Sequence, residues 1–287
     1  MTARFVLLYV KEGQLQRLVP LDISVIIPTC DRPDYVREAL ASVRAQQAPP
    51  REILVIDNGT RTLCSSGMPP EVQLFRLPAK VGPSRARNFG AAIATSTHLA
   101  FLDDDDSWDP SFLFEAFSTL EKEQVRCVYG RKALDVPGGT IDYRLATPDN
   151  LNVATLLRRN PGTGGMNLLI ERRLFLEIGG FDDRLRLSED RALALEVLLS
   201  GERIAVAPDA VAVVRQHTSD RLRQRPIRKF PFVWKYRRLY SATGFAMAVA
   251  RILAAAGLAQ ALRTAGIIRN LIRRENTADF RPRNRAP

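Results

Sequence analysis

Residues 23–46 read ISVIIPTCDRPDYVREALASVRAQ, and this stretch decides the fold class. The run ISVII (23–27) is apolar and β-branched and ends at Pro28, which is typical of a strand buried in a parallel sheet. Asp31 is then expected to cap a helix, with Pro33 near its first turn. The apolar residues of that helix fall on one face: Tyr35, Val36, Ala39, Leu40 and Val43. A strand followed by a helix that packs on the sheet is therefore predicted.

The same alternation continues over the first 120 residues. A second helix is predicted over 82–95 (GPSRARNFGAAIAT), and further strands are predicted at 52–57 (EILVID), 72–77 (VQLFRL) and 98–102 (HLAFL). Alternating strands and helices are typical of an α/β sheet with crossover helices. Ligands of such sheets bind beyond the carboxyl ends of the strands. The polar clusters at these ends are expected to open on one edge of the sheet: PTCD (28–31), DNGT (57–60) and DDDD (103–106).

The second half of the chain has a less regular pattern. Its predicted helices are ERRLFLEIGGFD (171–182), stopped by a Gly pair, and SEDRALALEVLLSG (188–201), capped by Ser188. Its predicted strands are 125–129, the end of PGTGGMNLLI (161–170), RIAVAP (203–208) and AVAVV (210–214).

Composition limits the possible classes. The chain has 287 residues, 46% of them hydrophobic, which suits one large domain with a sizeable core. No run of 18 apolar residues occurs, so no transmembrane helix is expected, and the first residues lack a signal-peptide cleavage site. Cys30, Cys64 and Cys127 are too scattered for a disulfide framework or a zinc site. We therefore expect a cytoplasmic protein with reduced thiols.

Positive charge is concentrated at the C-terminal end. Residues 215–287 contain 17 Lys and Arg against 3 Asp and Glu, whereas residues 1–214 contain 25 against 28. Residues 245–271 favour a helix that could lie on an anionic membrane, pack on the rest of the chain or bind a second subunit. No nucleic-acid partner is expected, because the rest of the chain has no nucleic-acid motif. Roughly the last 12 residues are expected to be disordered.

Four consecutive aspartates, Asp103–Asp106, follow the predicted strand at 98–102. At an effective dielectric of ~20, two such charges ~5 Å apart repel by roughly 3 kcal/mol. Mg²⁺ and Mn²⁺ take carboxylate oxygens, often only one or two from the protein, with phosphates supplying others. The alternative is capping of the helix that begins near Asp109 and Pro110, which would use only one or two of the four. The run therefore favours a metal–diphosphate site.

Six motifs, in this order, resemble those of the family 2 glycosyltransferases. They are SVIIPTCDRPDYVREALASV, EILVIDNGT, VGPSRARNFGAA, HLAFLDDDDSWDP, IGGFDDRLRLSEDRALALEVLLSG and RIAVAPDAVAVVRQH. The resemblance covers about residues 23–217. It implies an α/β fold of the type called GT-A, with a central, mostly parallel sheet flanked by helices. The implied organisation is an N-terminal extension (1–21), a GT-A domain (22–217) and a basic helical extension (218–287).

The resemblance implies a nucleotide-sugar site. Pro28, Thr29 and Asp31 match residues that cradle the nucleotide, and Asp57 matches a carboxylate that reaches the base or ribose. Asn58 stands where the family often has a second Asp, which leaves the identity of the base open because an amide both donates and accepts. The other matches to this site are Arg85, Arg87, Asn88, Asp103 and Asp104. A UDP-sugar is the expected donor, with dTDP- and GDP-sugars as alternatives.

The resemblance also implies the chemistry. Asp103 and Asp105 match the D-x-D motif that holds Mg²⁺ or Mn²⁺, Asp105 as main ligand, and His217 matches a residue that reaches the metal or diphosphate. Asp190, next to Glu189, matches the base that deprotonates the acceptor. Alternatively, both acids simply complement the dipole of their helix.

The last implied group is a pocket for the acceptor or the donor sugar. Its residues are Gly164, Gly165, Met166, Asn167 and Trp108. An ordinary turn at the glycines and core packing of Trp108 are the alternative readings. The whole pattern predicts a metal-dependent, inverting glycosyltransferase acting on a hydroxyl of a glycan, a lipid-linked glycan or a small molecule. A sugar nucleotidyltransferase and a non-catalytic binding member of the fold are the alternatives.

Overall fold

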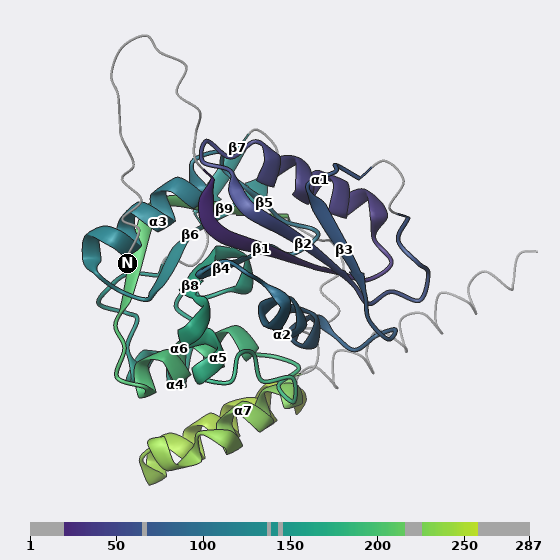
Figure 1. Ribbon diagram of the computed structural model, residues 1–287. Coiled ribbons are helices and arrows are strands. Elements are labelled where there is room, and N and C mark those ends of the chain that lie inside the picture. The colour runs from purple at the N-terminus through teal and green to yellow at the C-terminus, as the bar shows by residue number, and fades with distance from the viewer. Residues whose placement is uncertain (1–19, 65–67, 137–138, 143–145, 216–225, 258–287) are drawn as a thin grey trace, which may run out of the picture.

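The computed structural model describes residues 20–64, 68–136, 139–142, 146–215 and 226–257. Within them one nine-stranded sheet has the order β3-β2-β1-β4-β8-β6-β9-β5, with β7 paired to β6 (Figure 1). The strands are β1 (Leu21–Thr29), β2 (Pro50–Asp57), β3 (Val72–Arg76), β4 (His98–Phe101), β5 (Ser107–Trp108), β6 (Cys127–Val136), β7 (Gly139–Asp142), β8 (Leu168–Glu171) and β9 (Ile204–Val214).

Helices flank both faces of the sheet. The α-helices are α1 (Pro33–Arg44), α2 (Pro83–Ile93), α3 (Phe112–Glu123), α4 (Val153–Arg158), α5 (Arg172–Glu177), α6 (Glu189–Leu199) and α7 (Phe230–Lys235). The 3₁₀ turns are η1 (Gly165–Asn167), η2 (Pro226–Lys229) and η3 (Arg237–Leu239). Residues 242–257 are also helical.

The first half of the sheet is parallel, as predicted. Strand β1 pairs in parallel with both β2 and β4, and β2 pairs in parallel with β3. Thr29 lies opposite Asp57, so β1 and β2 end at the same edge. The crossover helices α1 and α2 carry the chain back to the opposite edge, where the next strand begins, which confirms the expected α/β arrangement.

The second half of the sheet is mixed. Strand β8 is antiparallel to β4 and β6, β9 is parallel to β6, and β5 is antiparallel to β9. The prediction of two strands at 203–208 and 210–214 was wrong, because β9 is continuous and its register shifts between Gly130 and Arg131 of β6. Pro208 lacks an N–H for the ladder, which accounts for the interruption in the pattern without ending the strand.

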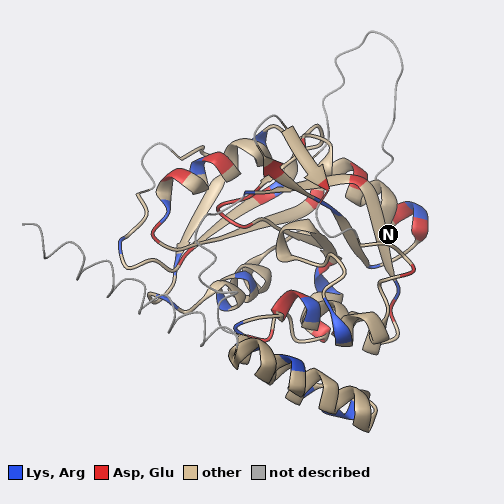
Figure 2. Cartoon of the chain, turned by 180° about the vertical axis from the view of Figure 1, so that it is seen from behind, with Lys and Arg blue, Asp and Glu red and all other residues tan. Residues whose placement is uncertain are grey.

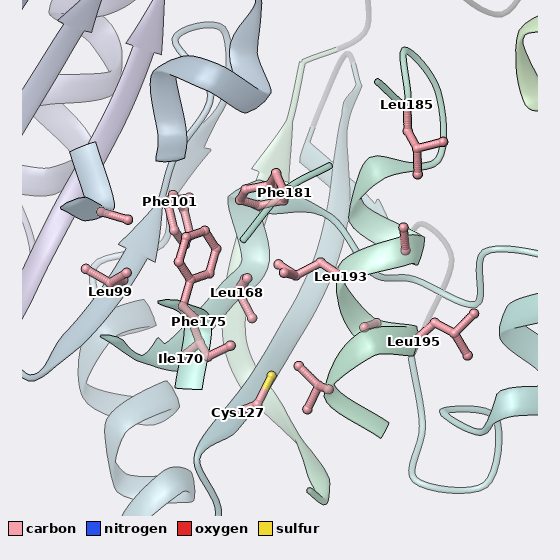
Figure 3. Packing of buried hydrophobic residues seen from close by; sticks show 14 of the residues in the cluster. Leu99, Phe101, Cys127, Leu168, Ile170, Phe175, Phe181, Leu185, Leu193 and Leu195 are labelled. Carbon is pink, nitrogen blue, oxygen red and sulfur yellow. The ribbon is translucent and has the colours of Figure 1, made fainter. Parts of the chain in front are cut away.

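The core lies in two layers. On one face of the sheet, α1 and α3 pack against alternate residues of β1, such as Val25 and Ile27. On the other face, α2, α5 and α6 pack against Ile26 and Phe101; Figure 3 shows part of this second layer, with Phe101, Phe175 and Phe181 in contact. The layers hold the strand ends, and therefore the predicted site, in a fixed frame.

The C-terminal segment packs on the second layer. Phe232 and Tyr236 are buried there, and the Arg191 guanidinium of α6 lies 3.7 Å from the centre of the Phe232 ring. The Tyr236 hydroxyl donates to Glu196 at 2.8 Å, and the Tyr240 hydroxyl donates to the Leu157 carbonyl at 2.6 Å. Of the three expectations for residues 245–271, packing on the rest of the chain is seen as far as residue 257, since Ile252 is buried in this layer and Phe245 and Val249 pack against it. In the described part of the chain, no helix has both the length and the apolar character needed to cross a bilayer. The end of the chain, expected to be disordered, lies outside the described residues.

One predicted helix cap was wrong, and the other is confirmed in position only. Asp31 does not cap α1, whose N-cap residue is Arg32; instead, Asp31 has a φ of 59° and accepts hydrogen bonds from Thr60 and Arg61. Ser188 is the N-cap residue of α6, as predicted, but it has a φ of 75° and its side chain makes no capping hydrogen bond. Both residues adopt left-handed backbone at the edge where the predicted site lies, which overrides their capping preference.

Candidate active site

Three strand ends meet at one edge of the sheet, as the sequence predicted. The Thr29 hydroxyl at the end of β1 donates to the Asp104 carboxylate at 2.8 Å. The Asn58 side chain, just after β2, donates to the Thr29 carbonyl at 2.7 Å. PTCD, DNGT and DDDD therefore form one connected surface, with Pro28 pairing opposite Ile56 behind it.

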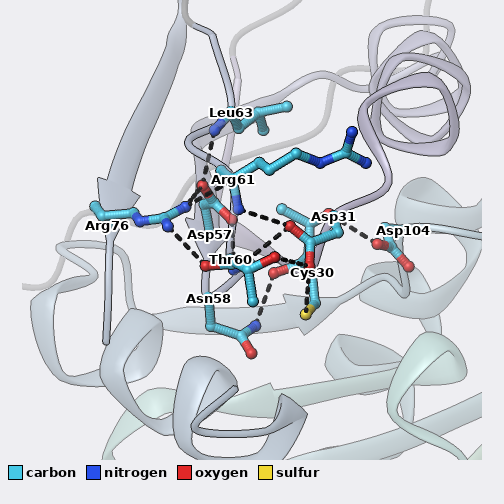
Figure 4. A network of polar contacts seen from close by, with 11 residues as sticks. Cys30, Asp31, Asp57, Asn58, Thr60, Arg61, Leu63, Arg76 and Asp104 are labelled. Atoms are coloured by element: carbon cyan, nitrogen blue, oxygen red, sulfur yellow. Dashed lines mark hydrogen bonds and ion pairs between the residues drawn. The ribbon is translucent and has the colours of Figure 1, made fainter. Parts of the chain in front are cut away.

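Asp31 and Asp57 order the loop that follows β2 (Figure 4). Asp57 is buried and accepts from the backbone N–H groups of Gly59 and Leu63 and from the Arg76 guanidinium. Asp31 accepts from the N–H groups of Arg61 and Thr60, which lower the pKa of its carboxyl to about 2. These contacts give both carboxylates a role in shaping the loop, whereas their predicted contact with a nucleotide stays a prediction.

The acidic loop alternates between open and buried carboxylates. The side chains of Asp103 and Asp105 are 24% and 18% exposed, and that of Asp104 is 8% exposed. Burial raises the pKa of Asp104 to about 6, against the effects of Thr29 and Arg32. Burial, together with Asp103 and Asp105, also raises the pKa of Asp106 well above its usual value, although the Arg215 N–H donates to it at 3.0 Å. The D-x-D pair is thus the accessible half of the run.

Arginines compensate the charge of this loop. Arg87 of α2 forms an ion pair with Asp103. Arg32, which the sequence reading missed, lies 3.1 Å from Asp104 and 2.6 Å from Asp105. Its position directly after PTCD was the only available signal, because its partners are more than 70 residues away.

Arg87 has donors that remain unused. Although burial opposes its charge, Asp103 and Asp190 raise the pKa of Arg87 above its usual value. Its Nε and Nη1 atoms are buried and have no hydrogen-bond partner among the described residues. A Cβ atom on Gly165 would lie 3.1 Å from the guanidinium carbon, so the glycine permits this close approach. Arg87 is therefore positively charged and fixed by its ion pair with Asp103, and its unused Nε and Nη1 donors could bind an anion.

Glu189 and Asp190 open helix α6 next to Arg87. Burial, and then the neighbouring Asp190, raise the pKa of Glu189 to about 7. Burial also raises the pKa of Asp190; Arg87 opposes the shift and Asp103 adds to it. The Asp190 Oδ1 atom is buried and accepts no hydrogen bond from the residues described. A carboxylate with a raised pKa and a free oxygen is suited to accept a proton near neutral pH.

Lys132 of β6 is a second residue that the sequence reading missed. It is 6% exposed, and its Nζ donates to the Thr163 carbonyl at 3.3 Å. Its positive charge partly opposes the rise that burial causes in the pKa values of Asp106 and Asp190. A Cβ atom on Gly164 would lie 3.3 Å from the Lys132 Nζ. The signal was a lysine inside an apolar strand pattern, since lysine is almost never buried without a reason.

The predicted sugar-pocket turn lies beside these charges. Gly164 is the N-cap residue of the η1 turn, which Gly165, Met166 and Asn167 form; Asn167 is fully buried and donates to the Gly162 carbonyl at 3.2 Å. Trp108 is 4% exposed, stacks on Phe112 with ring centres 4.5 Å apart, and donates from Nε1 to the Met166 carbonyl at 2.6 Å. Trp108 therefore supports the turn from the core, which agrees with the packing alternative.

Two other predicted nucleotide contacts are engaged elsewhere in the structure. The Asn88 side chain donates to the Phe181 carbonyl at 2.8 Å and accepts from the Phe181 N–H at 2.9 Å. Arg85 is exposed and pairs with Asp183 at 2.5 Å. Both contacts tie α2 to the loop before α6. Their predicted role toward a nucleotide remains a prediction, and His217 lies outside the described residues.

The donor set of the acidic loop fits a hard divalent cation. The described residues contain no group of three His, Cys, Asp or Glu arranged to hold a metal ion by itself. Mg²⁺, however, is commonly bound by one or two carboxylates together with substrate phosphates and water. Asp103 and Asp105 are the open carboxylates here, and the unused Arg87 donors lie next to Asp103. The site therefore fits a cation that arrives with a diphosphate, and it does not fit a closed structural metal site.

Relatives with known names share this sequence pattern. The chain is 28% identical over 206 residues to the succinoglycan biosynthesis protein ExoO of Rhizobium meliloti (strain 1021), covering 66% of this chain and 59% of ExoO. It is 27% identical over 172 residues to the glycosyltransferase AglE of Haloferax volcanii, covering 57% of each chain. The chain thus spans less than two thirds of the length of these two relatives.

Solved structures share the fold. TarS 1-349 of S. aureus in complex with UDP-GlcNAc aligns with a TM-score of 0.61 at 17% identity, covering 81% of this chain and 72% of that one. The complex of the same fragment with UDP aligns with a TM-score of 0.57 at 20% identity, covering 68% and 61%. The sheet order, the flanking helices and these alignments establish the GT-A fold.

The family model for glycosyl transferase family 2 matches residues 24–178. The match runs from β1 through α5 and includes the strand ends, the acidic loop and the η1 turn. It covers more than half of the chain, and the chain belongs to glycosyl transferase family 2.

Proposed function

We propose that this protein is an inverting glycosyltransferase that moves a sugar from a nucleoside diphosphate to a hydroxyl acceptor. The observation that carries the proposal is the position of Asp190. Its unpartnered Oδ1 lies in a buried setting shared with Arg87 and Asp103, while Glu189 and Asp190 also line a large groove on the other side. One carboxylate thus adjoins a candidate donor site and a candidate acceptor site.

The donor is proposed to bind along the connected strand ends. Thr29, Asp31, Asp57 and Asn58 surround the loop where a base and ribose would lie, and Arg87 would meet the diphosphate. TarS, which has the same fold, was solved with UDP and with UDP-GlcNAc. A UDP-sugar is therefore the first candidate, with dTDP- and GDP-sugars as the alternatives.

Asp190 is proposed to act as the general base. It takes the proton of the acceptor hydroxyl, whose oxygen attacks the anomeric carbon from the face opposite the diphosphate. A bond from that oxygen to the anomeric carbon forms, and the bond from the anomeric carbon to the diphosphate breaks. The electron pair leaves with the nucleoside diphosphate. Arg87 and Lys132 are the buried cations that hold charge near this position.

Asp105 and Asp103 are proposed to hold Mg²⁺ or Mn²⁺ together with the donor diphosphate, and His217 is a further candidate ligand. When bound, the cation would stabilise the negative charge of the leaving diphosphate. Arg32 would have to release Asp105 for this to happen. Its side chain is 47% exposed, so its alternative is to point into water.

The division of the chain follows from the same proposal. Residues 22–217 are the proposed catalytic domain, and 218–287 are its basic extension. The described part of the extension contains no acidic residue, as Figure 2 shows from behind, and Trp234, Met247 and Leu253 are more than half exposed. These features favour peripheral contact of the extension with an anionic membrane.

A product assay tests the function. The protein is incubated with UDP-, dTDP- and GDP-sugars, Mn²⁺ and a mixture of hydroxyl acceptors, and the released nucleotide is identified. We expect a nucleoside diphosphate and a product of inverted anomeric configuration. Release of a nucleoside monophosphate or of pyrophosphate would contradict the proposal and point to another reaction class.

A further inference from the structure

A groove of about 1030 Å³ lies between the C-terminal segment and the start of α6. One side is formed by α4 and the residues after it, and the other by η2, α7 and the helix at 242–257. Glu189 and Asp190 lie in its lining. None of the predicted nucleotide-site residues within the described part of the chain lines it, so it is a separate space that adjoins the proposed base.

Five cations line this groove: the buried Arg191 of α6, whose guanidinium lies over the Phe232 ring, and Arg158, Arg159, Lys229 and Arg251. The last four are exposed. The nearby Lys235, outside the groove lining, pairs with Asp182 and Glu196 at 3.1 and 2.8 Å. No carboxylate in the described part of the chain lies within ion-pair distance of the four exposed groove cations. Their combined field therefore favours an anion brought by a ligand.

The remaining wall of the groove is apolar. Leu157, Val233 and Ile252 form its buried part, while Leu239 and Met247 are 41% and 56% exposed. Such open apolar side chains beside cations match a ligand with a charged group next to a hydrocarbon chain. An unmodified neutral sugar has neither a charged group nor a hydrocarbon chain.

We propose that this groove binds an acceptor whose sugar is linked through phosphate or diphosphate to an apolar chain. The inference rests on the proposed function, because it assigns the groove to the acceptor of that reaction. The cations would hold the phosphate, the apolar wall would hold the first part of the chain, and the sugar hydroxyl would reach Asp190. Because Glu189 and Asp190 are also acidic, the phosphate must sit toward the cations, with the sugar between it and the base.

Binding is measured first, on the full chain saturated with UDP and Mn²⁺ so that the donor site is filled. The probes are n-decyl diphosphate below its micelle concentration, inorganic diphosphate and decanol. We expect decyl diphosphate to bind at least about tenfold more tightly than either part alone, since the phosphate and the chain contribute together.

Variants then locate the site. Arg158→Ala combined with Arg159→Ala should weaken decyl diphosphate binding by about 10- to 100-fold. Met247→Glu should also weaken it, while UDP binding is unchanged in both. The matched control is Arg173→Ala, an exposed arginine on α5 outside the groove. Equal binding of inorganic and decyl diphosphate, or equal loss in the control, would overturn the proposal.

Transfer assays show whether the phosphate must carry an apolar chain or can belong to a free sugar phosphate. They also test the groove assignment separately from the proposed glycosyltransferase function. A sugar linked to decyl diphosphate should be a better acceptor than the same sugar 1-phosphate or the free sugar. Equal rates for all three would overturn the groove assignment while leaving the glycosyltransferase function intact. If no acceptor yields nucleoside diphosphate but decyl diphosphate still binds through Arg158 and Arg159, the proposed reaction fails and the binding site stands.

Discussion

The two sides of Asp190 handle charge in opposite ways. On the donor side, the carboxylates of the acidic loop are already matched by Arg87 and Arg32. On the groove side, the cations have no carboxylate partner among the described residues. A site whose charges are arranged in advance can stabilise a reacting group without reorganisation, whereas a site with unmatched charge selects what binds. Under the proposed function, the difference means that the reaction and the selection of the acceptor would depend on separate parts of the molecule.

Removing the carboxylate between the two sides has the largest expected effect. Asp190→Asn should lower the transfer rate by about 10²- to 10⁴-fold, because the acceptor proton loses its base. Affinity for UDP, measured by calorimetry, should stay within about twofold, since a neutral amide of the same shape leaves the nucleotide contacts in place. Asp209→Asn, an exposed change on β9, serves as the control. Full transfer activity in Asp190→Asn would remove Asp190 as the base.

Changing the open half of the acidic loop tests the donor side alone. Asp105→Ala should lower transfer by at least about 10²-fold, because support for the leaving diphosphate is lost. Chelation of divalent cations should cause a similar loss in the unmodified protein and little further loss in the variant. Thermal unfolding should show an intact fold, and binding of decyl diphosphate in the groove should not change. The exposed Asp34→Ala is the control, and a metal-dependent rate that survives in Asp105→Ala would contradict the assignment.

A smaller change tests how closely Arg87 must be placed. Gly165→Ala puts a Cβ atom 3.1 Å from the Arg87 guanidinium carbon, so the side chain must shift by a few tenths of an ångström. The transfer rate should fall roughly tenfold with little loss of stability. Gly257→Ala, whose added Cβ meets no atom within 4 Å, is the matched control and should leave the rate unchanged. Steady-state rates for both variants decide the comparison, and equal rates would show that Arg87 tolerates displacement.

The last expected effect is on stability, not on the transfer rate, and depends on pH. Burial and Asp190 raise the pKa of Glu189 to about 7, above the value of about 4.5 expected in the unfolded chain. The stability linked to this raised pKa is therefore fully present below about pH 4.5 and is lost as pH rises toward 7. Glu189→Gln cannot ionise, so it should reduce this pH-dependent loss of unfolding free energy by up to about 3 kcal/mol.

Urea unfolding at pH 5 and pH 8 checks this sign. The unfolding free energy should fall more between these two values in the original protein than in Glu189→Gln. Glu123→Gln, an exposed change on α3, should follow the original protein. A parallel fall in Glu189→Gln would show that other groups carry the pH dependence.

The sequence predicted the parallel half of the sheet because its pattern is local. A buried strand such as β1 is a short apolar run with a turn at its end, and its neighbours repeat the pattern. Strand β5, with only two residues, and β7, with four exposed residues, leave no such pattern. Arg32 and Lys132 were missed for a related reason: each acquires its role from Asp104 or Thr163, far along the chain. The family resemblance identified Asp190 as a candidate base. Its unpartnered oxygen and raised pKa could not be predicted, because they depend on residues that only the fold brings close to it.

Helix α6 has one further consequence for how such proteins diverge. Its first turn carries Glu189 and Asp190. Farther along the helix, Glu196 accepts a hydrogen bond from the Tyr236 hydroxyl, and the Arg191 guanidinium lies over the Phe232 ring. Substitutions in the segment that holds Phe232 and Tyr236 reshape the groove wall without touching β1, β2 or the acidic loop. Under the proposed function, lineages that keep the donor-site residues are therefore expected to acquire new acceptors through changes in this segment, and their sequence variation is expected to concentrate there.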